Sequence, residues 1–203
     1  GNTTNNAPNS PDGNLHIQDS SAGTVTADAD ANELILESSG NTGMSILSPG
    51  SGESSIYFGN PGTNGQKDAW IKYYHETHST TANRRALTFR TSGGEKLRID
   101  SNGDVLINRE TSIDVASTAT AKLQVKHDAG NISAAFYSTA DALGPSGVLA
   151  LGHARGSDSG VLQNNDVLGQ IRFAGGDGND LNTVGALISA EVNGTPSGNV
   201  MPT

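Results

Sequence analysis

Two short runs in the sequence contain residue types that bind metal ions. A zinc-binding pair of histidines lies at the HExxH spacing on a helix, whereas His75 and His78 are one residue closer and follow a strand-like run. The run Gly175 to Asp180 begins like a calcium-binding β-helix repeat, but it occurs once, and Asn182 stands where the repeat needs an apolar residue. We therefore expect no metal and no cofactor, and we interpret the second run as a turn between strands.

Paired carboxylates would be the other route to chemistry, because two acids roughly 5–9.5 Å apart can hydrolyse a glycosidic bond. The candidates Glu76, Asp158, Asp166 and Glu191 lie in no recognisable pattern. The run Gly156 to Gly160 has an aspartate at its centre, so it is not a nucleophile elbow. The sequence predicts that the chain is not an enzyme.

Aromatic side chains gather at one place, where Trp70, Tyr73 and Tyr74 precede His75. Flat aromatic faces with polar edges suit the stacking of sugars, so these three aromatic residues are the candidate ligand-binding residues, for a glycan. The alternation of a strand favours a different interpretation, in which Trp70 and Lys72 separate from Ile71 and Tyr73 onto opposite faces, one in the core and one in solvent.

Composition limits the class of fold that could position such residues. Of 203 residues, 33% are hydrophobic, 4% are aromatic and 26 are glycine. Only 16% are charged, against a usual share of about 25%. A chain this rich in glycine and poor in large apolar side chains is either disordered or built from short strands and tight turns. The net charge of −9 argues against nucleic acid as a partner, and no apolar run is long enough for membrane insertion.

Hydrophobic residues recur with a period of two, which indicates strands. The expected strands are Leu34–Leu36, Met44–Leu47, Ile56–Phe58, Trp70–Tyr74, Leu87–Phe89, Leu97–Ile99, Val105–Ile107, Leu123–Val125, Ile132–Tyr137, Val148–Leu151, Leu168–Phe173 and Ala186–Val192. Between them, Asn64-Gly65, Asn102-Gly103, Asp177-Gly178 and Asn193-Gly194 accept the positive φ angles of tight turns. The sequence therefore predicts an all-β chain.

One strand and its turn occur twice. Leu34-Ile35-Leu36-Glu37-Ser38-Ser39-Gly40 matches Leu97-Arg98-Ile99-Asp100-Ser101-Asn102-Gly103. Such a repeat suggests units that stack along an axis on neighbours or on other chains, and chance similarity between glycine-serine turns is the alternative. We expect an irregular N-terminal arm over 1–32, a β-repeat segment over 33–108, a connector over 109–120 and a second β segment over 121–203.

The order of these motifs resembles a known family. Residues 95–107, from Glu95-Lys96-Leu97-Arg98-Ile99-Asp100 to Val105-Leu106-Ile107, look like the hairpin that recurs in bacteriophage tail fibre proteins. Ala121-Lys122-Leu123-Gln124-Val125 resembles the strand that commonly follows it, and 168–192 with Gly194-Thr195-Pro196 and Met201-Pro202 resembles the segment often found before a C-terminal intramolecular chaperone. The resemblance covers roughly residues 33–203.

The resemblance implies an elongated trimeric fibre, as a triple β-helix or as small β-sandwich segments. Short glycine-punctuated strands also expose edges that one chain cannot cover, which favours a parallel homotrimer with shared cores. The expected function is that of a structural component of a phage tail fibre in the virion, contributing to host-cell attachment and receptor recognition. Its expected partners are other tail or baseplate proteins and a host surface glycan or protein receptor. The alternatives are a polysaccharide-degrading tailspike and a bacterial surface adhesin.

Overall fold

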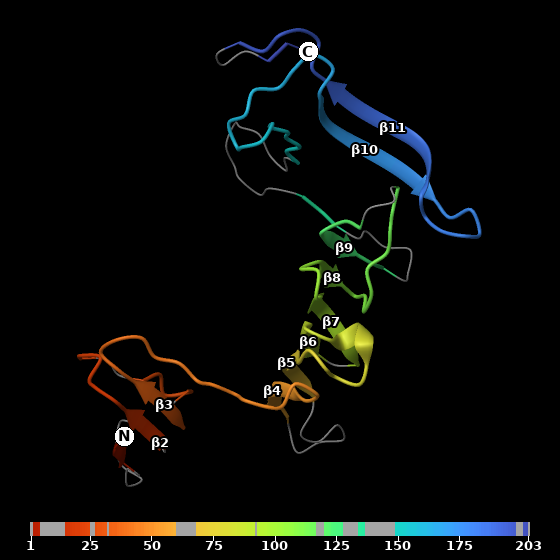
Figure 1. The fold of residues 1–203 in the computed structure, drawn as a ribbon. Helices are drawn as coiled ribbons and strands as arrows, with labels where there is room; N and C mark the ends of the chain where they lie inside the picture. Colours follow the sequence, from red (N-terminus) through yellow and green to blue (C-terminus); the bar gives the residue numbers. More distant parts are fainter. Residues whose placement is uncertain are drawn as a thin grey trace. The chain divides into compact units, whose positions relative to one another are not determined.

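The computed structural model of the chain contains short β-strands joined by turns and loops, which confirms the expected all-β class (Figure 1). The structure describes residues 2–4, 15–24, 27–31, 33–59, 68–91, 93–116, 120–127, 134–136, 149–197 and 201–202. Within these residues the single helical element is a 3-10 turn, η1 (Thr81–Asn83), and no helix is long and apolar enough to cross a membrane. The chain divides into two units, Gly1–Leu47 and Ser48–Thr203.

The first unit is a three-stranded sheet of β1 (Asn2–Thr4), β2 (Leu15–Gln18) and β3 (Leu34–Glu37). Strand β2 is antiparallel to β1 and parallel to β3. Its apolar residues find partners that are distant in sequence, because Leu15 pairs with Leu34 and Ile17 with Leu36. The expectation of an irregular arm over 1–32 is therefore corrected: β1 and β2 lie within it and belong to the same unit as β3.

The second unit contains a six-stranded sheet, the central sheet, in which strands neighbour one another in chain order. It consists of β4 (Glu53–Phe58), β5 (Ala69–Tyr74), β6 (Leu87–Thr91), β7 (Gly94–Ile99), β8 (Val105–Ile107) and β9 (Leu123–Val125). All neighbours are antiparallel except β8 and β9, which are parallel.

The turn between β7 and β8 shows why this part of the sequence forms a hairpin. The Asp100 Oδ1 atom accepts the backbone N–H groups of Asn102 and Asp104 at 2.8 and 3.0 Å. Gly103 has a φ of 76°, a conformation that glycine adopts without steric cost. The predicted Asn102-Gly103 turn is confirmed, and its aspartate supplies the hydrogen bonds that close it.

The unit ends in a long antiparallel hairpin of β10 (Val167–Gly175) and β11 (Thr183–Glu191). The predicted turn at Asp177-Gly178 joins these strands, and Gly178 has a φ of 96°. The two strands extend beyond the predicted runs at their turn ends.

Some expected strands differ from the structure. Met44–Leu47 forms no strand, and the described parts of two other expected strands, residues 134–136 and 149–151, are also irregular. The rest of those two, 132–133, 137 and 148, lies outside the described residues, as does the Asn64-Gly65 turn. The boundary between the two units falls after Leu47, inside the expected β-repeat segment over 33–108.

Candidate functional site

The central sheet has two faces of opposite character. Residues paired across neighbouring strands point to the same side of a sheet, so the register assigns each side chain to a face. The apolar face carries Ile56, Phe58, Ile71, Tyr73, Leu87, Phe89, Leu97, Ile99, Val105, Ile107, Leu123 and Val125. The polar face carries Glu53, Tyr57, Trp70, Lys72, Tyr74, Thr88, Arg90, Glu95, Arg98, Leu106 and Gln124.

The polar face is buried at its centre, although Tyr57 on β4 is 39% exposed. Thr88 and Leu106 are fully buried, Arg98 is 2% exposed, and Lys72 and Gln124 are each 7% exposed. A charged side chain is buried at a tolerable cost only when it is paired and hydrogen-bonded, so each of these groups must find partners within the chain.

Arg98 holds the loop that contains η1 against this face. Its Nε and Nη2 atoms donate to the two carboxylate oxygens of Glu95 at 2.6 and 2.9 Å. Its Nη1 donates to the Ala82 carbonyl oxygen and its Nη2 to Asn83 Oδ1, both at 3.0 Å. Burial alone would lower the pKa of Arg98, but the hydrogen bond and charge of Glu95 raise it, so the guanidinium stays charged.

Gln124 does the same for the segment after β8. Its Oε1 accepts the Ile113 backbone N–H at 3.1 Å, and its Nε2 donates to the Ile113 carbonyl oxygen at 3.0 Å. This side chain thus pairs with a loop backbone as another strand would. Together Arg98 and Gln124 show that the chain covers its own polar face.

Lys72 lies among aromatic rings on the same face. Its Nζ atom is 2.7 Å from Glu53 Oε1 and 4.5 Å from the ring centre of Trp70. The rings of Tyr57 and Tyr74 lie slightly farther away, at 5.6 and 5.4 Å. Burial opposes the charged ammonium, but the hydrogen bond to Glu53 and the surrounding groups raise the pKa of Lys72 above its usual value.

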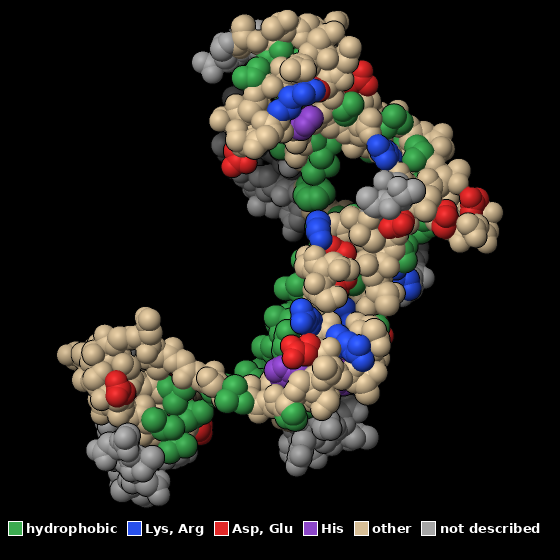
Figure 2. All heavy atoms as spheres, in the orientation of Figure 1, with side chains coloured by type: hydrophobic (Ala, Val, Ile, Leu, Met, Phe, Trp, Pro, Cys, Tyr) green, Lys and Arg blue, Asp and Glu red, His purple; other side chains and the backbone are tan. Residues whose placement is uncertain are grey.

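The apolar face remains open in the single chain. Seven of its side chains are more than a third exposed, with values between 37% for Ile99 and 61% for Leu123. Figure 2 shows hydrophobic side chains gathered along one side of this sheet. Single exposed apolar residues are ordinary, but a contiguous group of this size marks an interaction surface.

Only two of the three candidate glycan residues share a surface. Trp70 and Tyr74 lie on the polar face beside Lys72, whereas Tyr73 lies on the apolar face and contacts His75 edge-on at 5.2 Å. The ring of Trp70 is also 4.4 Å from the guanidinium carbon of Arg90. The alternation of β5 therefore divides the three aromatic side chains.

The two histidines of the metal-like run make separate contacts. His75 Nε2 lies 3.0 Å from Ser54 Oγ, and His78 Nδ1 accepts the Thr80 backbone N–H at 3.1 Å. In the part of the chain that the structure describes, no three His, Cys, Asp or Glu side chains are grouped so as to hold a metal ion.

In the Gly175–Asp180 run, the carboxylates accept hydrogen bonds from the turn itself. Asp177 accepts from the backbone N–H groups of Asn179 and Asp180 at 2.9 and 3.1 Å and from Thr183 Oγ1 at 2.8 Å. These hydrogen bonds lower the pKa of Asp177 to about 2. Asp180 accepts from Asn182 in the same way, through its backbone N–H at 2.8 Å and its Nδ2 at 3.1 Å.

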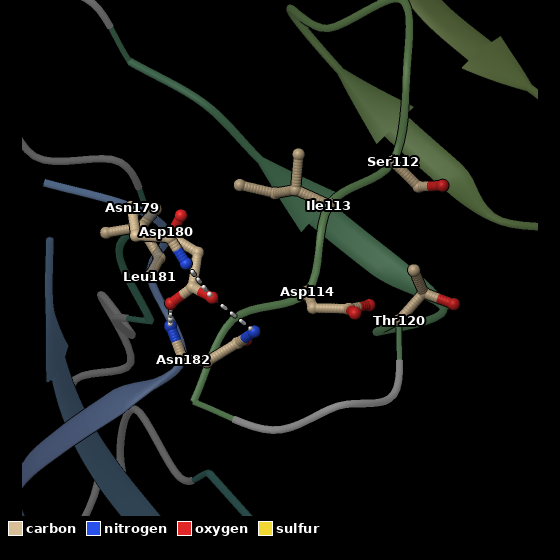
Figure 3. Close-up of a pocket in the computed structure, with 8 residues that line it drawn as sticks. All are labelled: Ser112, Ile113, Asp114, Thr120, Asn179, Asp180, Leu181 and Asn182. Carbon is tan, nitrogen blue, oxygen red and sulfur yellow. Dashed lines mark hydrogen bonds between the residues drawn. The ribbon is translucent and has the colours of Figure 1, made fainter. Parts of the chain in front are cut away.

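This turn borders a cavity of about 520 Å³. Figure 3 shows that the Asp180 carboxylate turns toward Asn182, while Asp114 extends toward Thr120 on the other side of the cavity. The two carboxylates do not converge on a common point. The cavity therefore lacks the paired acids that hydrolysis of a glycoside requires.

Two of the other acidic candidates pair with arginines. Asp166 is held by Arg155, with two contacts of 2.6 Å that lower the pKa of Asp166 well below its usual range. Glu76 lies 3.8 Å from Arg85. Neither carboxylate faces a second acid in these contacts.

Comparisons of the chain with models of protein families, with curated proteins and with solved structures find no match. Sequence reasoning did not identify the apolar face as a site. The alternation of each strand shows in the sequence which residues share a face. The register that joins six such strands into one surface does not show in the sequence.

Proposed function

We propose that this chain is a structural segment of a bacteriophage tail fibre, which works as a homotrimer in the virion and contributes to host-cell attachment. The observation that carries the proposal is the central sheet, in which the chain covers the polar face and leaves the apolar face open. The sequence of residues 33–203 resembles tail fibre proteins, and a trimeric fibre is an assembly in which such a sheet would be covered by other copies.

The distribution of charge favours another copy of the same chain as the partner. All charged side chains on the paired positions of the sheet lie on the polar face, where Glu53 pairs with Lys72 and Glu95 with Arg98. The apolar face carries none, so three identical faces can approach a common axis without repulsion between like charges. Cyclic symmetry then gives every copy the same environment and leaves no apolar face uncovered.

The size of the surface supports an obligate assembly. Six strands at roughly 4.8 Å spacing give a face about 25 Å wide, which is comparable to one side of a small domain. A chain with a thin core and an open sheet of this width gains its stability from association, as obligate oligomers do.

Light scattering coupled to gel filtration of the full chain tests the proposal. We expect a mass near three times 20.8 kDa, with loss of the β-sheet signal only when the assembly dissociates. A monomer that stays folded at nanomolar concentration would refute the trimer. Attachment is tested separately, by the binding of the purified trimer to host cells against a trimer preparation unfolded by heat.

A further inference from the structure

The two sides of the β10–β11 hairpin differ in polarity. Arg172 pairs with Leu187 on one side of the hairpin, where its Nη1 donates to the Ala116 carbonyl oxygen at 2.8 Å. Its Nε and Nη2 donate to Gln170 Oε1 on the same side, at 3.0 and 2.7 Å. Arg172 therefore contacts the same chain at Ala116, whereas Leu187 on the same side of the hairpin is 50% exposed.

The opposite side is apolar and is exposed at Ile171 and Phe173, although the Leu151 side chain lies against it at Gly169. Ile171 pairs with Ile188, and Phe173 pairs with Ala186 on the same side. The three large side chains are 44%, 60% and 54% exposed for Ile171, Ile188 and Phe173, respectively. We call Ile171, Phe173, Ala186, Ile188 and Ala190 the ribbon face.

A hairpin of two strands is at best marginally stable in water, because it has too little apolar surface to bury by itself. The β10–β11 hairpin is nine residues long on each strand, and every residue of β11 is exposed. Such a long ribbon needs a partner along its open side. The ribbon face carries no charged side chain, whereas Arg172 lies on the other side, so the ribbon face is suited to contact with an identical surface.

We infer that the ribbon face of each copy packs against the ribbon faces of the other copies, as a second contact within the homotrimer. The inference rests on the proposed trimer and adds a specific surface to it. It places Ile171, Phe173 and Ile188 close to their counterparts in the neighbouring copies, and it places Ser189 away from them.

The absence of cysteine from the sequence allows a direct test with single-cysteine variants of the full chain. Ile188→Cys puts a thiol on the ribbon face, and Ser189→Cys puts one on the opposite side of the same strand as a matched control. A disulfide requires Cβ atoms roughly 4 Å apart, so a short bismaleimide cross-linker is used as well to tolerate a small offset. Light scattering of the reduced proteins establishes their mass first.

We expect Ile188→Cys to form covalent dimers at least tenfold faster than Ser189→Cys under the same mild oxidant and with the cross-linker. Ile171→Cys, which is paired with Ile188, should behave like Ile188→Cys and protects against a failure of one variant to fold. Trimers in which both ribbon-face cysteines react no faster than Ser189→Cys would overturn the ribbon contact and leave the proposed trimer standing. Folded monomers of the unmodified chain would overturn both.

Discussion

The apolar face of the central sheet can be tested by making it polar while keeping β-branched side chains. Ile99→Thr with Ile107→Thr keeps branched side chains that favour strands but removes apolar surface. The two isoleucines are 37% and 38% exposed in the single chain. Burying a whole isoleucine contributes roughly 1.5–3 kcal/mol, so burying the remaining third contributes about 0.6–1.1 kcal/mol. For two side chains in three copies, this comes to about 4–7 kcal/mol.

Loss of most of that free energy should weaken the trimer by roughly a thousandfold or more, at about 1.4 kcal/mol per tenfold. The assay is a dilution series in a fixed, mild urea concentration, with the fraction of trimer measured by mass photometry. Val161→Thr is the control, because Val161 is 70% exposed but lies on neither the apolar face nor the ribbon face. Equal dissociation of the double variant, the control and the unmodified chain would show that the apolar face does not join copies.

Three further predictions concern groups inside one chain. Arg98→Met should lower the free energy of unfolding by about 3 kcal/mol, because it leaves Glu95 buried without its partner. Urea titrations at fixed protein concentration measure this loss, and adding Glu95→Gln should restore part of it. An unchanged midpoint would show that Arg98 does not hold the η1 loop in place. The lowered pKa of Asp177 predicts that its turn keeps full stabilisation above about pH 4 and loses it as pH falls through about 2; a carboxyl titration by NMR with a midpoint near the usual 3.8 would contradict this. EDTA should leave the melting temperature unchanged. If the protein bound an ion present at a hundred times its dissociation constant, removing that ion would cost ~2.7 kcal/mol of stability and lower the melting temperature by several degrees.

The strands were the most predictable part of the fold. Leu97–Ile99 and Val105–Ile107 were correctly read as strands because alternation and an Asn-Gly turn gave the same answer. The turn at Asp177-Gly178 was also predicted correctly, because this pair of residues accepts the positive φ angle that Gly178 adopts. By contrast, Met44–Leu47 alternates in the same way yet forms no strand. Alternation is a local signal, and a strand also needs a neighbour to pair with.

The assignment of the faces was beyond the sequence. Charged and amide side chains usually point to solvent, so Arg98 and Gln124 would be placed outside and their apolar neighbours inside. The structure reverses this order because the η1 loop and the Ile113 segment lie over the polar side chains. Those contacts join each strand residue to a partner 11 to 16 positions away, in η1 or near Ile113, outside the strands whose alternation the sequence shows. In the first unit the strand at Leu34–Leu36 was predicted, but its sheet was not, because Ile17 pairs with Thr3 on one side and with Leu36 on the other, in segments far apart in the sequence.

Mutations on the covered polar face and on the open apolar face should differ in their effect when altered and intact chains assemble together. In the proposed trimer, a defect at Arg98 would impair chiefly the chain that carries it. A defect at Ile107 would also act on the copies it contacts, so when altered and intact chains are made together, most assemblies would contain an altered one. Substitutions on the apolar face should therefore behave as dominant when both kinds of chain are produced in one cell, whereas substitutions beneath the η1 loop should be recessive.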